Sequence, residues 1–294
     1  MSPALVSQQL AFGLFVGGTY AIAAVGLSLV FGVLRVLNVA HGELLMLGGY
    51  LSFWAFTLLK VDPFVSALIC GPALLLFGLA LNWGLFSWVE RLDEENKIKN
   101  SLLISFGLTL VIQNVAQLLW TADDRSVNVS YGGAGALLAG VVVPYARLAT
   151  LVLGLLVILA LDQLLRRTYF GKAVRATAED WQAASLAGIN IQRTYLLTFG
   201  VGAALAGIAG AFVSVSASIT PLVGTAWMLK ALVVVVLAGM GSIFGSFAAG
   251  VLLGVAEALS IFVIGASYRE VVGLVLFLLV LLLRPQGLFG RALR

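Results

Sequence analysis

The chain is constrained most by a succession of apolar segments that are long enough to cross a lipid bilayer. A spanning helix needs about 20 apolar residues, because a membrane supplies no water to satisfy an open backbone. We predict nine segments, at 8–34, 40–59, 63–89, 101–121, 147–165, 194–216, 226–240, 246–265 and 269–284. The short seventh segment is a candidate for a re-entrant or broken helix. The predicted fold is all-α, a polytopic transmembrane bundle of about 8–10 spans in one domain, 1–294.

The composition supports a membrane protein and excludes several other classes. Hydrophobic residues make up 61% of the 294 positions and charged residues only 10%, whereas soluble domains carry roughly 25% charged residues. The net charge is +4. In a membrane protein, basic residues mark the cytoplasmic side and do not indicate a nucleic-acid partner. His41 is the single histidine and Cys70 the single cysteine, so we predict no metal site and no cofactor.

Basic residues predict the orientation of the spans. With the N-terminus outside, 12 of the 17 Lys and Arg residues fall in cytoplasmic loops and 5 fall outside. The cytoplasmic set is Arg35, Arg91, Lys97, Lys99, Arg166, Arg167, Lys172, Arg175, Arg193, Arg284, Arg291 and Arg294. The outer set is Lys60, Arg125, Arg147, Lys230 and Arg269. The bias predicts an N-out, C-in topology, in which Lys230 and Arg269 snorkel to the outer surface.

The longest polar interruption on the cytoplasmic side is Arg166–Arg193, RRTYFGKAVRATAEDWQAASLAGINIQR. It contains a short predicted helix with Thr177 as its N-cap, and Glu179 and Asp180 in its first turn. Asp180 follows Thr177 by three residues, which is a loose form of the capping box, and Gly188 stands where the helix ends. Most such loops only connect spans, but a capped helix indicates a surface that another protein contacts. On the outer side, the loop at 121–144 is either a flexible connector or a partner contact.

No enzyme constellation is present in the sequence. There is no GxxxxGK[ST] loop for ATP and no His partner for a catalytic triad. Polar residues inside spans are therefore the candidate functional positions. Glu257 is the clearest of these, and the sequence leaves open whether it has a substrate or gating role or makes a buried structural hydrogen bond. Gln113 and Asn114 lie in the middle of the fourth segment.

Two glycine-rich stretches predict hinges. The first, residues 32–50, contains Asn38, His41 and Glu43, and the second, residues 237–254, contains Gly239 and Gly241. Broken helices of this kind line cavities in transporters, where corresponding breaks in two halves point to the translocation path. The alternative is that both stretches are ordinary turns between spans.

Several of these stretches carry a family resemblance. LSLVFGVLRVLNVAHGELLMLGGYL (27–51) resembles the signature of LivH-type permeases of hydrophobic amino-acid ABC importers. RATAEDWQAASLAGIN (175–190) resembles the cytoplasmic coupling segment of that family, and GMGSIFGS with LLGVAE (239–246 and 252–257) resembles its C-terminal hinge. Gln182 replaces the usual acidic residue of the coupling motif, and Phe244 stands where many relatives have proline.

The resemblance implies a transport subunit of a bacterial inner membrane that lacks its own ATPase. Its implied partners are a second, LivM-like permease, two cytoplasmic ATPases, a periplasmic substrate-binding protein and membrane lipid. The implied function is alternating-access import of branched-chain or other hydrophobic amino acids, or of a similar small neutral solute. The implied ATPase-coupling residues are Thr177, Glu179, Asp180, Gln182, Ala183, Ala184 and Gly188. The path or hinge residues are Asn38, His41, Glu43, Asn114, Gly239, Gly241 and Glu257.

Two other hypotheses compete with this one. The first is a self-contained, ion-coupled secondary transporter that uses Glu257 as its proton or ion site. The second is a membrane enzyme or channel, against which the missing catalytic cluster counts. The predicted cytoplasmic helix favours the importer subunit, because a chain without a nucleotide motif has to receive its energy from another chain.

Overall fold

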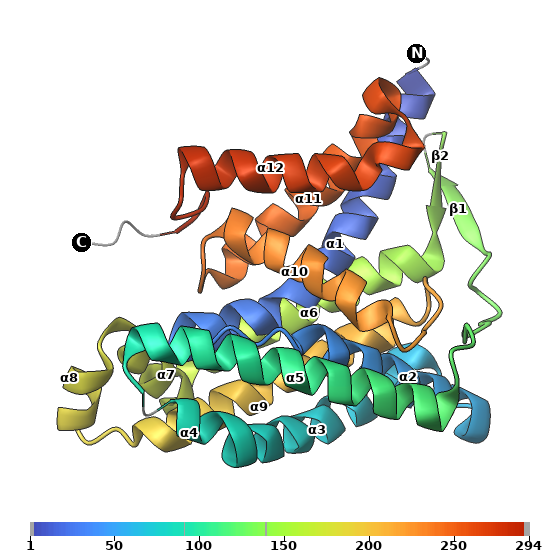
Figure 1. Cartoon of the computed structure of the whole chain (residues 1–294). Helices are drawn as coiled ribbons and strands as arrows, with labels where there is room; N and C mark the ends of the chain where they lie inside the picture. The colour runs from blue at the N-terminus through green and yellow to red at the C-terminus, as the bar shows by residue number, and fades with distance from the viewer. Residues whose placement is uncertain (1–2, 91, 139, 291–294) are drawn as a thin grey trace.

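A computed structural model describes residues 3–90, 92–138 and 140–290 as a bundle of long helices (Figure 1). Within them each predicted apolar segment forms a helix. These are α1 Pro3–Leu34, α2 His41–Leu59, α3 Pro63–Leu81, α5 Glu94–Trp120, α6 Tyr145–Arg167, α9 Ile191–Val213, α10 Val223–Ala238, α11 Ile243–Ile264 and α12 Arg269–Leu283. Seven are long and apolar enough to span a membrane, whereas α10 has 16 residues and α12 has 15. The prediction of a polytopic helical membrane protein is confirmed.

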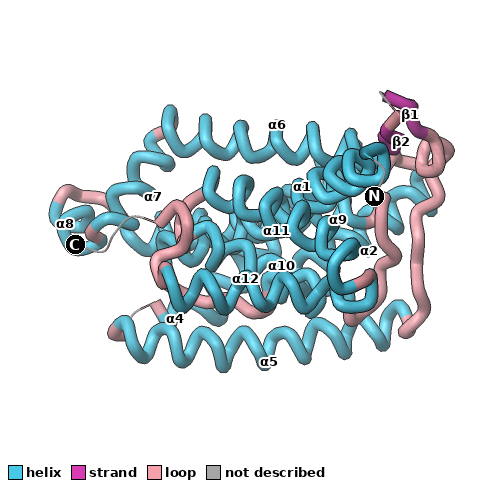
Figure 2. Tube along the Cα trace, turned by 90° about the horizontal axis from the view of Figure 1, so that it is seen from above, coloured by secondary structure: helices cyan, strands magenta, loops and turns pink. Residues whose placement is uncertain are grey.

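The bundle has two distinct ends (Figure 1). One of them, which we call the α8 end, contains the short helix α8 (Trp181–Leu186) and residues 284–290 after α12, which we call the C-terminal tail. The N-terminus and a β-hairpin of β1 (Gly135–Leu138) and β2 (Val141–Pro144) lie at the other, which we call the hairpin end. Figure 2 shows α5 and α6 on opposite flanks, with the remaining helices between them. Arg91, Arg291 and Arg294 of the predicted cytoplasmic set lie outside the described residues.

Helix α1 is the central element of the bundle. Its 32 residues extend about 48 Å at 1.5 Å per residue, which exceeds the ~30 Å hydrocarbon core of a bilayer. Along this length glycines of α1 face glycines of α11, and a Cβ atom added to Gly17 would lie 2.6 Å from the carbonyl oxygen of Gly250. Small residues let the two backbones approach closely, which is how membrane helices gain packing energy without a hydrophobic drive.

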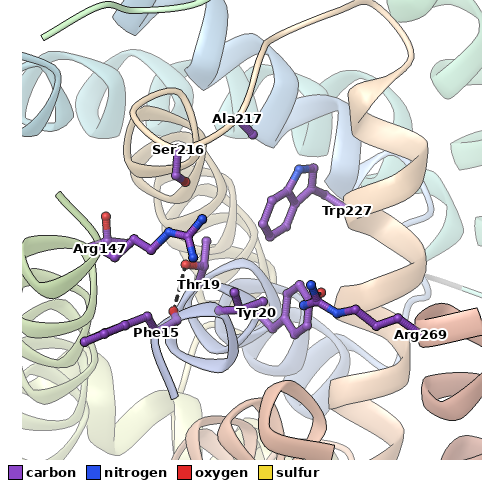
Figure 3. Close-up of a pocket in the computed structure, with 10 residues that line it drawn as sticks. Phe15, Thr19, Tyr20, Arg147, Ser216, Ala217, Trp227 and Arg269 are labelled. Atoms are coloured by element: carbon purple, nitrogen blue, oxygen red, sulfur yellow. Dashed lines mark hydrogen bonds between the residues drawn. The ribbon is translucent and has the colours of Figure 1, made fainter. Parts of the chain in front are cut away.

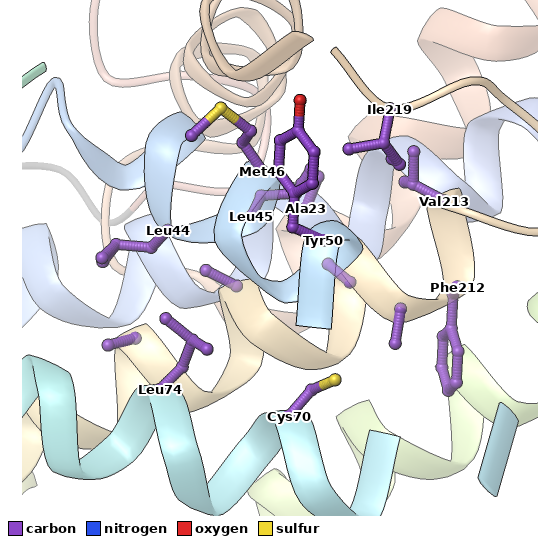
Figure 4. Close-up of a cluster of buried hydrophobic side chains, with 14 of the residues drawn as sticks. Ala23, Leu44, Leu45, Met46, Tyr50, Cys70, Leu74, Phe212, Val213 and Ile219 are labelled. Atoms are coloured by element: carbon purple, nitrogen blue, oxygen red, sulfur yellow. The ribbon is translucent and has the colours of Figure 1, made fainter. Parts of the chain in front are cut away.

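A second packed layer consists of α2, α3 and α9 (Figure 4). Tyr50 of α2 is fully buried and stacks on Trp120 of α5 with ring centroids 4.2 Å apart. Cys70 of α3 is buried and free, and its Sγ lies 3.5 Å from the carbonyl oxygen of Gly48. Cys70 is therefore a small residue of the packed core. These helices pack closely together, and α1 and α10 lie against the layer that they form.

The chain is not helical at residues 35–40, between α1 and α2. His41, the first residue of α2, places Nε2 3.2 Å from the carbonyl oxygen of Ala23. Ala23 precedes the end of α1 by eleven residues, so α2 begins about 16 Å inside the bundle from that end. The N–H of Leu37 donates to Oγ of Ser101 (3.2 Å), and Oγ of Ser105 lies 3.2 Å from the Leu37 carbonyl oxygen. Irregular backbone at membrane depth is tolerated where protein groups satisfy it in this way.

The loop at 121–144 is more ordered than a flexible connector. It contains the antiparallel hairpin, whose Val142 exchanges two hydrogen bonds with the side chain of Gln8 at 2.8 and 3.0 Å. The hydroxyl of Tyr131 donates to Oδ2 of Asp62 at 2.5 Å. Burial, reinforced by this hydrogen bond, raises the pKa of the Tyr131 phenol, so the contact keeps its proton across the physiological pH range. The loop closes the hairpin end by attachment to α1 and α3.

Candidate functional site

The predicted cytoplasmic helix is in fact two helices. The first is α7 (Tyr169–Glu179), whose N-cap Thr168 accepts a hydrogen bond of 3.0 Å from the N–H of Gly171. Thr177 is buried in the last turn of α7, so the prediction that it caps a helix in a capping box is wrong. Asp180 is the N-cap of α8, and its Oδ1 accepts from the N–H groups of Gln182 (2.9 Å) and Ala183 (3.0 Å). An extended backbone at Asp180 turns the chain between the helices and frees this carboxylate to cap.

The end of α8 is a Schellman motif, as the glycine predicted. Gly188 has a φ of +86°, a conformation that glycine adopts without a Cβ penalty. Its N–H donates to the Ser185 carbonyl at 3.0 Å, and the N–H of Ile189 donates to the Ala184 carbonyl at 3.0 Å. These are the two bonds that define the motif. Both ends of α8 are therefore satisfied locally, although the helix has only six residues.

Helix α8 projects from the end of the bundle (Figure 1). It presents apolar side chains to the surroundings. Leu186 is 91% exposed and Trp181 is 47% exposed. Ala184 is buried against the bundle and fixes the position of the helix. The remaining predicted coupling residues are exposed, and they are Glu179, Asp180, Gln182, Ala183 and Gly188. Exposed large apolar groups on a rigid projection are typical of a protein-binding surface.

The first predicted hinge residues lie deep inside the bundle. Asn38, His41 and Glu43 are all buried, at or just after the break between α1 and α2. The first turn of α2 meets the first turn of α10 here, because a Cβ atom on Gly224 would lie 2.5 Å from Oε2 of Glu43. Two helix N-termini, each with a partial positive charge, thus converge near the Glu43 carboxylate.

A polar chain of side chains links three helices at this level. Nε2 of Gln113 in α5 donates to Oε1 of Glu43 (2.9 Å) and lies 2.7 Å from Oγ1 of Thr225 in α10. Asn114 is exposed, and its amide donates to the Leu110 carbonyl of its own helix at 2.7 Å. The structure therefore brings Gln113 to the hinge and turns Asn114 away from it.

The second predicted hinge contacts the first. Gly239 and Gly241 have φ values of +89° and +90° in the turn between α10 and α11. A Cβ atom on Gly32 of α1 would lie 2.5 Å from Cα of Gly241. The C-terminal tail pairs with the residues just before this turn, through the N–H of Leu288 to the Leu237 carbonyl at 2.8 Å. Both glycine-rich stretches thus share one close contact at the α8 end.

Glu257 of α11 holds together three other helices. Its Oε1 accepts from Nζ of Lys230 at 2.7 Å, and its Oε2 accepts from Nε of Arg269 at 3.2 Å and from the Tyr20 hydroxyl at 2.9 Å. Its side chain is completely buried, while those of Lys230 and Arg269 are 19% and 23% exposed. The expectation that both cations snorkel to the surface is wrong, because the buried carboxylate attracts both.

A polar pocket of about 210 Å³ lies next to this cluster (Figure 3). It is lined by Phe15, Val16, Thr19 and Tyr20 of α1, by Arg147 and Thr150 of α6, by Ser216, Ala217 and Trp227, and by Arg269. In Figure 3 the side chains of Arg147 and Trp227 face each other across the space, with Arg269 beside Tyr20. A smaller cavity of about 140 Å³ on the other side of the cluster contains Glu257 in its wall.

Several residues of these sites were not singled out from the sequence. Tyr20, Arg147 and Trp227 lie on three different helices, and nothing in the linear sequence relates them. Gln113, in contrast, is predicted from the sequence together with Asn114 as a mid-span polar residue, and only burial distinguishes the two. A signal did exist for Lys230, which stands in the middle of an apolar run where a charge is costly without a partner.

Among the described residues, no three His, Cys, Asp or Glu side chains lie close enough together to hold a metal ion. The arrangement instead combines a projecting apolar helix, a broken pair of helices and a polar pocket within a membrane bundle.

Comparison with known proteins places the chain in context. A family model described as "Branched-chain amino acid transport system / permease component" matches residues 9–282. The chain is 35% identical over 295 residues to the high-affinity branched-chain amino acid transport system permease protein BraD of Pseudomonas aeruginosa, covering 97% of this chain and 95% of the relative. It is 34% identical over 297 residues to LivH of Escherichia coli K12, with the same coverage of both chains. Similarity at 27% identity extends to the ribose import permease RbsC of that organism, with 89% of this chain and 81% of RbsC covered. No solved structure matches the chain.

Proposed function

Because the chain belongs to the family of branched-chain amino acid transport permease components, we propose that it is the transmembrane permease subunit of an ATP-binding cassette importer. Its substrates are branched-chain or other hydrophobic amino acids, which it moves into the cytoplasm by alternating access. The chain itself hydrolyses no ATP. The relatives named LivH and BraD are permease proteins of such systems, and their similarity covers nearly the whole chain.

The membrane of this importer is the bacterial inner membrane, and the α8 end faces the cytoplasm. The charge bias of the loops supports this N-out, C-in orientation. Basic residues gather around α7 and α8, where Arg166, Arg167, Lys172 and Arg175 lie. The hairpin end then faces the periplasm, where a substrate-binding protein delivers the solute.

The observation that carries the proposal is the α8 projection. A six-residue helix with both ends capped and with Leu186 almost fully exposed has no function inside this chain. It fits a groove on a cytoplasmic ATPase, and the ATP-driven closure of two ATPases would push on it. Since Ala184 packs against the bundle, the push passes into α7 and α9 and then to the broken helices. Rigid-body movement of packed elements around a hinge is an established route for such coupling.

The two glycine-rich breaks supply the hinge. Gly32 and Gly241 touch near the α8 end, and the first turns of α2 and α10 meet at Glu43 in the interior. Asn38, His41, Gly239 and Gly241 occupy positions where the backbone can bend without breaking a long helix. Asn114 faces outward from α5 at membrane depth, which suits contact with a second, LivM-like permease better than contact with lipid tails.

The test is reconstitution of the chain with its cognate permease, ATPases and binding protein in proteoliposomes. We expect uptake of L-leucine that requires ATP inside the cytoplasmic compartment. Replacing Leu186 with Asp is expected to abolish uptake and to release the ATPases from the complex, and Val263→Asp serves as a matched control. Val263 is 84% exposed in the last turn of α11, away from α8. Its replacement should therefore leave ATPase binding intact.

A gradient-driven activity of this chain alone would contradict the proposal. In that case uptake would proceed without ATP and would stop in Glu257→Gln, as expected for a secondary transporter. The arrangement around Glu257 favours a structural role, since its carboxylate already accepts bonds from Lys230, Arg269 and Tyr20.

A further inference from the structure

We infer that the pocket between α1, α6, α10 and α12 is a solute site that binds a zwitterionic α-amino acid, with Arg147 and Arg269 taking the carboxylate. The inference rests on the proposed function and adds a location and a binding chemistry to it. It is carried by three independent features of the pocket, which are its charge, its hydrogen-bonding groups and its size.

The pocket has an excess of positive charge. Arg269 shares the carboxylate of Glu257 with Lys230, so two cations face one anion. Glu270, in the first turn of α12, is the other acidic group next to this cluster. Arg147 makes no salt bridge within the described residues, and its guanidinium lies 4.4 Å from the ring centroid of Phe12.

A guanidinium without a carboxylate partner favours binding of an anion. Charge-assisted bonds between Arg and a carboxylate are among the strongest hydrogen bonds in proteins, and they are stronger still where water is scarce. Arg147 lines one wall of the pocket and Arg269 another. A small carboxylate between them would complete the charge balance that Glu257 provides only in part.

Two threonine hydroxyls of the pocket can act as acceptors. Thr19 donates its hydroxyl proton to the Phe15 carbonyl at 3.2 Å, and Thr150 donates to the Ala146 carbonyl at 3.0 Å. Because each hydroxyl has one proton, both oxygens retain lone pairs for a donor in the pocket. The ring of Trp227 lies across from Arg147 (Figure 3) and offers a π face to a cation. An ammonium group fits against this ring, across the pocket from Arg147.

The size of the pocket suits a solute as small as an amino acid. Its volume of about 210 Å³ is below the roughly 300–1,000 Å³ of sites for drug-sized ligands. Phe15, Val16 and Ala217 contribute apolar surface for a hydrophobic side chain. Ser216 lines the pocket and is exposed, so the space communicates with the hairpin end. A zwitterion with an apolar side chain therefore meets a complementary group on each wall.

Thiol labelling in the assembled transporter tests the charge of the pocket without requiring transport. In a Cys70→Ala background, a single cysteine is introduced by Ser216→Cys, or by Ser130→Cys as a control in the exposed outer loop. Each variant reacts with an anionic and with a cationic methanethiosulfonate, and the ratio of the two rates cancels the intrinsic reactivity of the thiol. We expect the anionic-to-cationic ratio to be roughly tenfold or more higher in the pocket than in the loop. Arg147→Gln should return the ratio to the value of the loop control.

Protection by ligands tests the recognition chemistry. L-Leucine should slow labelling of the Ser216→Cys variant, whereas leucinamide, which lacks the carboxylate, and isocaproate, which lacks the ammonium group, should not. Equal ratios at the two positions, or equal protection by all three compounds, would overturn the inference. ATP-dependent uptake by the wild-type complex is measured in parallel. If the wild-type complex takes up leucine but the Ser216→Cys variant shows neither charge preference nor protection, the solute site is refuted and the proposed function stands. If the variant shows both but the wild-type complex takes up no leucine, the proposed function is refuted and the solute site stands.

Discussion

The hydroxyl of Tyr20 and the Oε2 atom of Glu257 are 2.9 Å apart, although 237 residues separate them in the chain. This bond joins α1 to α11 at the point where Lys230 of α10 and Arg269 of α12 also converge. One buried carboxylate therefore ties four helices together. Burying a carboxylate costs solvation free energy, which is offset here by its ion pairs and hydrogen bonds with these partners.

Removing this carboxylate should destabilise the bundle strongly. Glu257→Ala leaves two largely buried cations without a counter-charge, for which the typical cost is about 3–5 kcal/mol. We expect a clear fall in the melting temperature of the purified chain, measured by fluorescence-detected size-exclusion chromatography after heating. Asp124→Ala, an exposed acid in the loop at 121–144, is the control. Equal melting temperatures for the two variants would show that the cluster contributes nothing to stability.

The close approach of α1 and α11 gives a second prediction. Gly17→Val places side-chain atoms where the backbone of Gly250 already lies, so the helices must separate and lose their packing. Overpacking of this kind typically costs about 1–3 kcal/mol. The control is Gly107→Val in α5, where no atom lies within 4 Å of an added Cβ. Thermal melting should decrease much more for the first variant than for the second, and the opposite order would contradict the packing described.

Much of this fold could be predicted from the sequence, because the free energy of transfer of an apolar segment into a membrane is nearly the sum of the contributions of its residues. Each predicted span formed a helix, and a glycine in the left-handed region ends α8 as expected. Tertiary partners could not be predicted in the same way. From the sequence, Lys230 and Arg269 are placed at the surface, because the hydropathy of a residue says nothing about a partner as distant in sequence as Glu257. Thr177 was assigned as a cap because the burial of that face of α7 depends on the bundle beneath it.

The same limit applies to the candidate site. Gln113 and Asn114 are adjacent and chemically similar, yet helical geometry rotates one toward Glu43 and the other outward by about 100°. From the sequence, the loop at 121–144 is either a flexible connector or a partner contact and no hairpin is predicted in it, although the valine run at 141–143 is typical of a strand. The pocket itself combines single residues from distant segments, and only the folded chain brings Arg147 and Arg269 to it.

The irregular segment between α1 and α2 depends on two serines of α5. Ser101→Ala leaves the N–H of Leu37 without its acceptor inside the bundle, and an unsatisfied buried donor costs about 1–3 kcal/mol. We expect lower thermal stability and faster hydrogen exchange in peptides that contain residues 35–40. Ser87→Ala is the control, because the hydroxyl of Ser87 bonds only to the carbonyl of Trp83 in the preceding turn. If exchange in residues 35–40 is unchanged in Ser101→Ala, the serine does not hold this segment.

The geometry at Gly188 separates a folding effect from a coupling effect. A φ of +86° costs a β-branched residue about 1–2 kcal/mol or more, whereas asparagine tolerates the left-handed region better. Gly188→Val should therefore distort the end of α8 and lower ATP-driven uptake while the complex continues to hydrolyse ATP. Gly188→Asn should retain most of the uptake, since it preserves the Schellman turn. Ala184→Asp, which buries a charge beneath α8, should uncouple in the same way as Gly188→Val. A distorted α8 cannot present Leu186 and Trp181 to the ATPase as the native helix does. Normal uptake in both Gly188→Val and Ala184→Asp would therefore exclude α8 as the element that receives the force.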